Sequence, residues 1–110
     1  MPNFDQQKFT PETIRSIDSA TFTGSYQALG TPLAHPSRML IFVNNSGVLV
    51  TVSWDGVNDH MVLLAGATVV LDETSNAVSL AVLDTYASTQ FYVKGSASTG
   101  LVYLSTFYAS

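Results

Sequence analysis

Apolar and polar side chains alternate with a period of two along most of the chain from residue 14 onward. The clearest alternation spans residues 48–54, where the apolar phase consists of Val48, Val50, Val52 and Trp54. This pattern is typical of a β-strand with one buried face. Residues 39–43 are instead apolar at every position, and such a run predicts a strand that is buried on both faces.

Turn-forming residues divide the chain into about eight short strands. We expect them at residues 20–29 (with a bend at Gly24), 39–43, 48–54, 60–64, 68–72, 77–83, 90–94 and 101–108. The alanine and leucine content of residues 77–83 leaves a short helix open there. Short turn clusters predict three hairpins, which join 39–43 to 48–54, 60–64 to 68–72, and 90–94 to 101–108.

The spacing of these strands indicates an all-β protein. Parallel strands would need crossover connections of about a dozen residues, usually helical, and the sequence offers none. We therefore predict an antiparallel two-sheet sandwich, jelly-roll or immunoglobulin-like, in preference to a closed barrel. Its predicted core consists of Met39, Ile41, Val43, Val50, Val52, Trp54, Val70, Val93, Val102 and Leu104.

The first 13 residues differ from the rest of the chain. Two prolines interrupt regular pairing there, and Phe4 and Phe9 are isolated apolar residues in a polar segment. We therefore divide the chain into an extended N-terminal arm, residues 1–13, and a β-sandwich domain, residues 14–110. Because the arm cannot bury its two phenylalanines locally, we predict that Phe4 and Phe9 are interface residues that contact a neighbouring subunit.

Composition narrows the range of partners. Only 11% of the residues are charged, against about 25% in an average soluble domain, so the surface is prone to associate with other proteins. Four basic residues and a net charge of −4 argue against direct binding to nucleic acid or to an anionic membrane. The chain has no cysteine and therefore no disulfide or thiolate site. The N-terminal sequence predicts no signal peptide.

The sequence contains no recognisable catalytic constellation. His35 lies in a loop and His60 at the start of a strand, and neither accompanies a nucleophile motif. Asp72 and Glu73 are adjacent, so their side chains would point to opposite faces of a strand. We therefore expect no enzymatic activity, no catalytic residues and no cofactor.

Two further patterns concern binding. Residues 55–60, Asp-Gly-Val-Asn-Asp-His, place oxygen ligands around a glycine, but they lack the downstream glutamate of a calcium loop. We interpret them as turn residues and expect no metal site. The second pattern is a set of aromatic residues that suits a carbohydrate-stacking platform: Trp54, Tyr26, Tyr86, Tyr92, Tyr103 and Tyr108.

The order of strand and turn signatures in residues 32–71 and 89–108 resembles a group of small virion proteins of tailed bacteriophages. The segments that carry the resemblance are Asn44-Asn45, Trp54-Asp55-Gly56, Asp59-His60, Leu64-Ala65-Gly66, Leu71-Asp72, the Gln90 to Gly95 segment and the Thr99 to Ser105 segment. The resemblance implies a β-sandwich subunit of a phage head, connector or tail that has no enzymatic activity.

Two functional hypotheses follow. The first is a structural subunit at the capsid surface or the head–tail junction, located in the virion after synthesis in the host cytoplasm. Its expected partners are further copies of itself (a homo-oligomer) and other virion proteins. The alternative is a small carbohydrate- or surface-binding module, which should gather its aromatic and polar residues in one concave patch.

Overall fold

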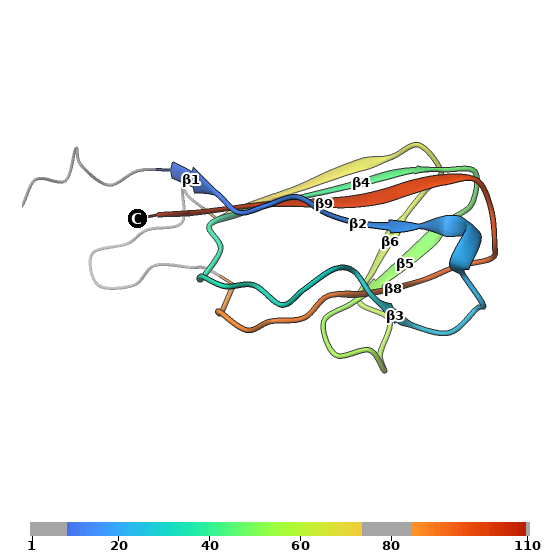
Figure 1. The fold of residues 1–110 in the computed structure, drawn as a ribbon, viewed down its shortest axis with the longest axis horizontal. Coiled ribbons are helices and arrows are strands. Elements are labelled where there is room, and N and C mark those ends of the chain that lie inside the picture. The colour runs from blue at the N-terminus through green and yellow to red at the C-terminus, as the bar shows by residue number, and fades with distance from the viewer. Residues whose placement is uncertain (1–8, 74–84, 110) are drawn as a thin grey trace, which may run out of the picture.

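The computed structural model describes residues 9–73 and 85–109, which form two antiparallel β-sheets packed face to face (Figure 1). Sheet A has the order β1-β9-β4-β7, and β2 pairs with the same edge of β9 as β1. Its strands are β1 (Phe9–Pro11), β2 (Arg15–Asp18), β4 (Met39–Ser46), β7 (Thr68–Asp72) and β9 (Gly100–Ala109). The predicted all-β, antiparallel two-sheet fold is confirmed.

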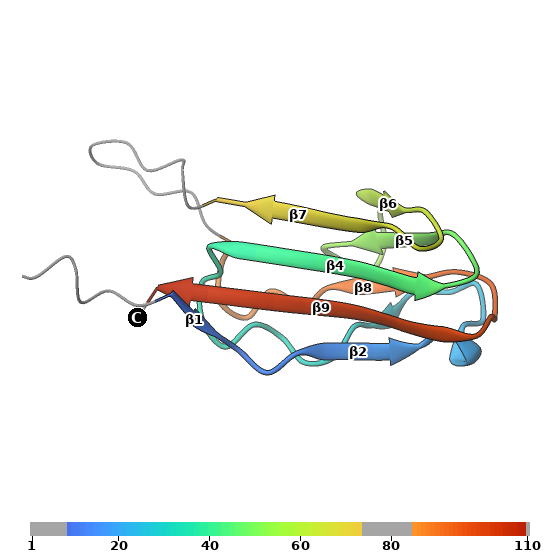
Figure 2. The same ribbon diagram turned by 90° about the horizontal axis from the view of Figure 1, so that it is seen from above.

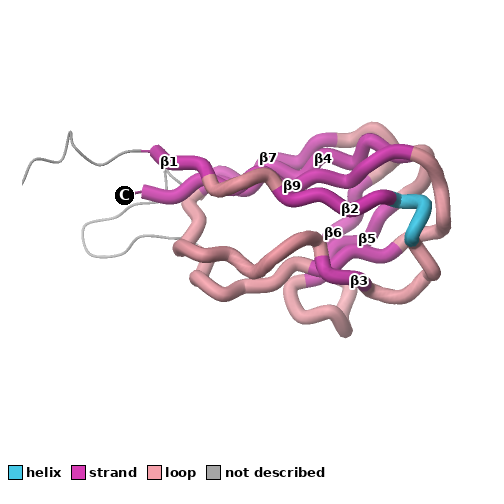
Figure 3. Tube along the Cα trace, in the orientation of Figure 1, coloured by secondary structure: helices cyan, strands magenta, loops and turns pink. Residues whose placement is uncertain are grey.

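Sheet B is smaller and has the order β3-β8-β5-β6. Its strands are β3 (Gln27–Ala28), β5 (Val50–Ser53), β6 (Met61–Leu63) and β8 (Tyr92–Lys94). Within the described ranges the helical structure is one 3-10 turn, η2 (Ser19–Thr21), at the end of β2 (Figure 3). The Asp18 side chain accepts a hydrogen bond from the Ala20 N–H and caps this turn.

The three predicted hairpins are wrong, because each pair of strands lies in opposite sheets. The chain crosses from sheet A to sheet B between β4 and β5, and it crosses back between β6 and β7 and again between β8 and β9. A buried amide explains the first two crossings. The Asn44 side-chain nitrogen donates to the carbonyl oxygens of Val48, Leu63 and Leu64 at 2.8, 3.1 and 3.1 Å, and so binds both connections to β4.

The predicted strand at residues 20–29 is also wrong over most of its length. Ser19–Thr21 form the 3-10 turn, Gly24 adopts a φ of +87°, and only Gln27–Ala28 forms a strand. The preceding segment, Arg15–Asp18, is a strand that the eight predicted strands did not include. The predicted strand at residues 77–83 lies outside the described residues.

Half of the predicted core residues are fully buried, and the wrongly predicted ones share one cause. Val50, Val52, Val93, Val102 and Leu104 are fully buried. In β4 the buried residues are instead Leu40, Phe42, Asn44 and Ser46, so Met39, Ile41 and Val43 face outward and are only half-buried. Val70 in β7 also faces outward and is 51% exposed. A run that is apolar at every position carries no signal of which phase faces the core.

The centre of the core is an aromatic cluster between the sheets. Phe42 lies edge-on to Phe91, with ring centroids 5.4 Å apart, and Trp54 lies 4.9 Å from Phe91. Trp54 is thus partly buried against the core, as the alternation of residues 48–54 predicts.

The described part of the expected arm is joined to its own domain. Phe9, Thr10 and Pro11 pair with Ala109, Tyr108 and Phe107 of β9, and the Phe9 ring stacks on Phe107 with centroids 5.0 Å apart. Phe9 is nevertheless 51% exposed. Phe4 lies outside the described residues.

Candidate functional site

The outward surface of sheet A is the main candidate for an interface. Alternation along the strands places one apolar set on this surface, here called the outer A face: Met39, Ile41, Val43, Val70, Leu101, Tyr103 and Phe107. The β-ladder brings these side chains together, because Met39 is paired with Phe107, Ile41 with Val70, and Val43 with Tyr103. Figure 2 looks onto this surface from outside the sandwich.

Charge is confined to the corners of the outer A face. Among the outward-facing strand residues of sheet A, only Asp18 and Asp72 are charged. Asp18 pairs with Leu101 at the end of β2, and Asp72 pairs with Met39 at the end of β7. The two carboxylates therefore occupy diagonally opposite corners, and the centre of the face has no charged side chain.

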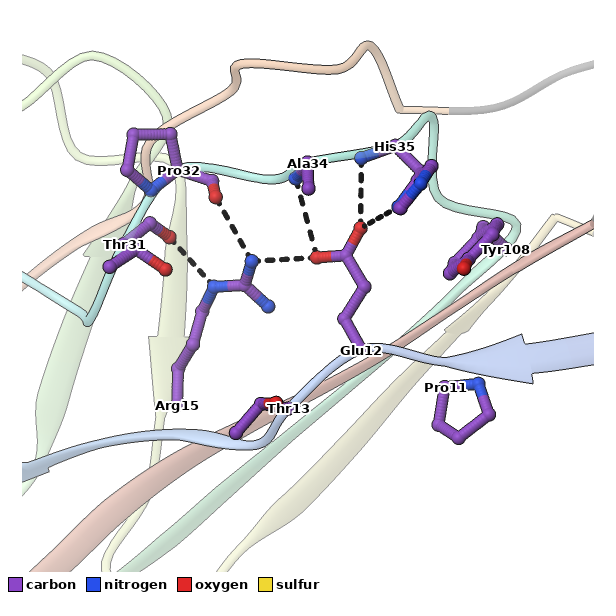
Figure 4. Close-up of a pocket in the computed structure, with 9 residues that line it drawn as sticks. All are labelled: Pro11, Glu12, Thr13, Arg15, Thr31, Pro32, Ala34, His35 and Tyr108. Atoms are coloured by element: carbon purple, nitrogen blue, oxygen red, sulfur yellow. Dashed lines mark hydrogen bonds and ion pairs between the residues drawn. The ribbon is translucent and has the colours of Figure 1, made fainter.

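A second candidate is an open pocket of about 370 Å³ between the start of β2 and the loop before β4 (Figure 4). Arg15, 6% exposed, lies at its base. The guanidinium donates to the carbonyl oxygens of Thr31 and Pro32 at 2.7 and 3.0 Å. It also donates to the Thr106 hydroxyl at 3.1 Å and to Glu12 Oε1 at 2.7 Å.

Glu12 follows β1 and binds the loop before β4. Its Oε2 accepts the His35 N–H at 2.8 Å and lies 2.9 Å from His35 Nδ1 (Figure 4). The His35 ring stacks on Tyr108 with centroids 3.8 Å apart. Burial alone would raise the pKa of Glu12, but hydrogen bonds from Arg15, His35 and the backbone of Ala34 lower it overall. Because internal contacts occupy both charged groups, we interpret this cluster as a structural junction.

The lowered pKa of Glu12 has a measurable consequence. The unfolded chain takes up the proton first, near the ordinary glutamate pKa of about 4.3, so this stabilisation is present above that pH and is lost as the pH falls further. We expect Glu12→Gln to lower the melting temperature most at pH 7. The difference from the wild type should shrink in thermal melts over the range in which the pH falls below about 4.3. A difference that stays constant over this range would contradict the assignment.

Residues 54–60 connect β5 to β6 and form a turn that is held in large part by its own hydrogen bonds. Asp55 accepts hydrogen bonds from the N–H groups of Val57 and Asn58, both at 2.8 Å, and these bonds hold the pKa of Asp55 well below its usual range. His60 Nδ1 accepts the Trp54 N–H at 2.9 Å. In the described ranges, no three His, Asp or Glu side chains gather as a metal site requires.

One end of this loop joins a polar cluster on the outer surface of sheet B. Asp59 accepts a hydrogen bond from the Tyr26 hydroxyl and forms a 3.0 Å ion pair with Lys94. The Lys94 ammonium lies 4.6 Å from the centroid of the Tyr26 ring. Burial, together with the carboxylates of Asp59 and Asp55, raises the pKa of Tyr26 to about 12.

The aromatic residues of the carbohydrate hypothesis occupy different parts of the molecule. Trp54 packs against the core, while Tyr26 and Tyr92 belong to the sheet B side. Tyr103 and Tyr108 lie on β9 in sheet A, and Tyr86 is 81% exposed in a loop. The structure thus does not bring these six residues together in one patch.

Sequence reasoning missed the outer A face and the Arg15 junction. Residues 39–43 did contain a signal for the outer A face. A strand that is apolar at every position has two apolar faces, and the second can be covered either by another part of the chain or by a partner protein. For Arg15 the sequence offers no signal, because its partners come from distant loops. Comparison with protein-family models, curated proteins and solved structures found no significant match. Within the described ranges, no helix is long and apolar enough to cross a membrane.

Proposed function

We propose that this chain is a non-enzymatic structural subunit of a bacteriophage particle, and that it acts through protein–protein interfaces. The observation that carries the proposal is the outer A face. Its centre combines aliphatic, aromatic and methionine side chains without charge, and the cores of protein interfaces have this composition. A surface of this kind on a solvated domain favours coverage by another protein.

The phage particle in this proposal is supported by the resemblance of the strand and turn signatures. Placement at the capsid surface or the head–tail junction belongs to the same proposal. The carbohydrate-binding alternative receives less support, because the described aromatic residues do not converge on one concave patch.

Incorporation into particles tests this function. A tagged copy of the chain, produced during infection by a phage that carries the gene, should be found by mass spectrometry in particles purified on a density gradient. Its amount should remain constant through a second gradient and a high-salt wash. Recovery of the chain only in the soluble fraction of the lysate would contradict the proposal.

The arm is tested by deleting residues 2–8. A longer deletion would remove β1 and Glu12, which belong to the fold. We expect the deletion to leave the far-UV circular dichroism spectrum and the melting temperature unchanged, because the proposal assigns residues 2–8 to contacts with a neighbouring subunit and not to the sandwich. Incorporation into particles should be lost, because Phe4 is proposed to contact a neighbouring subunit. Normal incorporation of the shortened chain would remove the assembly role of these residues.

A further inference from the structure

We propose that the outer A face binds the same face of a second copy of this chain around a two-fold axis. The inference rests on the proposed function in that it uses the same surface, and it adds the identity of the partner. In this arrangement the two A sheets pack face to face, so that the dimer contains four layers of sheet.

The position of the charges favours a second copy as the occupant. Two-fold packing brings each side chain near its counterpart or near another part of the same face, so a central charge would meet an apolar or like-charged surface. The outer A face has no such central charge, and Asp18 and Asp72 lie at opposite corners. The four-strand centre can thus be desolvated while both carboxylates stay at the rim in water.

The area of the outer A face fits a weak, reversible association. Four neighbouring strands about 4.8 Å apart, and eight residues at about 3.4 Å each, give a flat area of roughly 500 Å² per copy. The accessible area is larger than this flat area because the side chains project from the sheet. Specific interfaces begin at about 600 Å² per partner, so the outer A face matches a dimer in reversible equilibrium.

The uneven heights of the side chains on the outer A face also suit the packing of two sheets. Large and small residues are neighbours across the ladder: Ile41 is paired with Ser105, and Tyr103 with Ser16. Such rows of projecting and receding side chains can interdigitate when two sheets pack about 10 Å apart.

The chain offers a matched pair of variants for the test. Val70 in β7 and Val62 in β6 are both 51% exposed, both lie in an edge strand, and they face outward from opposite sheets. Lysine at either position remains on the surface of the monomer. Only Val70→Lys places two buried ammonium groups in the proposed dimer, whereas Val62→Lys changes an unrelated surface.

The first measurement is sedimentation equilibrium of the full chain over a range of concentrations. We expect the wild type and Val62→Lys to reach twice the mass of one chain with the same dissociation constant. Val70→Lys should weaken that constant at least about 100-fold, because the lost contact and the added charge occur twice in a two-fold interface. A wild type that remains a single chain up to high micromolar concentration overturns the proposal. Equal weakening by both variants, or by neither, also overturns it.

The second measurement locates the interface and uses the absence of native cysteine. In Val70→Cys the single thiol should react with a maleimide several-fold more slowly as the concentration rises into the dimer range. In Val62→Cys the reaction rate should not change. A Val70→Cys thiol whose reactivity is independent of concentration places the second copy elsewhere and overturns the assignment to the outer A face.

The two proposals can fail separately. A chain that is monomeric in sedimentation but present in purified particles overturns the two-fold dimer and leaves the structural function in place. A chain that dimerises through Val70 but is absent from particles has the opposite meaning: the interface is established and the phage function is wrong.

Discussion

Arg15→Ala should lower the free energy of unfolding by about 3–5 kcal/mol, the range found when one partner of a buried ion pair is removed. The Glu12 side chain is only 8% exposed, so the substitution leaves its carboxylate largely buried without a charged partner. It also leaves the carbonyl oxygens of Thr31 and Pro32 without the hydrogen bonds that Arg15 donates. Urea unfolding followed by tryptophan fluorescence measures the change, since Trp54 packs against the core.

The control for this prediction is Lys94→Ala. Lys94 also forms an ion pair, with Asp59 at 3.0 Å, but both side chains are substantially exposed. Exposed pairs contribute little because water screens them, so Lys94→Ala should change the unfolding midpoint only slightly. Similar losses for the two variants would show that the Arg15 junction is no more important than a surface contact.

Phe42→Ala should be about as damaging, with an expected loss of roughly 3–5 kcal/mol. Phe42 is fully buried in the aromatic cluster and contacts both Phe91 and Trp54, with ring centroids 5.4 and 6.4 Å away. Its truncation leaves a cavity that the two facing sheets can close only in part. Because a small domain has a total stability of about 5–15 kcal/mol, the variant should unfold at a much lower urea concentration than the wild type.

Phe9→Ala is the matched control, because it removes the same side chain from a half-exposed position. Phe9 stacks on Phe107 but keeps 51% of its surface in water, so we expect a loss of about 1 kcal/mol. A larger loss for Phe9→Ala than for Phe42→Ala would mean that the contacts of β1, rather than the aromatic cluster, dominate the stability of the domain.

The sequence predicts the class of this fold better than its connections. Alternation at residues 48–54 correctly assigns Val50 and Val52 to the core, because a half-buried strand records its orientation in its pattern. In residues 39–43 both phases are apolar, so the orientation of Ile41 and Phe42 was not determined by pattern. Only the pairing of β4 with β9 and β7 decides it.

The wrong hairpins have a different physical origin. A turn of a few residues reverses the chain equally well within one sheet or between two, and local sequence does not separate the two cases. Asn44 illustrates the difficulty, because an asparagine after an apolar run indicates a turn. In the structure Asn44 is a fully buried strand residue whose amide binds two connections at once. The junction around Arg15 was equally hidden, since Glu12 and the loop carbonyls meet it only in the folded chain.

The place of β9 in the sheet also sets the order in which the protein can be completed during synthesis. β1, β2 and β4 all pair with β9, which is the last described strand along the chain. At about 5–20 residues per second, several seconds pass between the appearance of β4 and that of β9. Through that interval the apolar strand β4 has one edge without its partner. Sheet A therefore closes in a late, non-local step, and a pause in translation before residue 100 would prolong the stage at which β4 presents an unpaired edge to other chains.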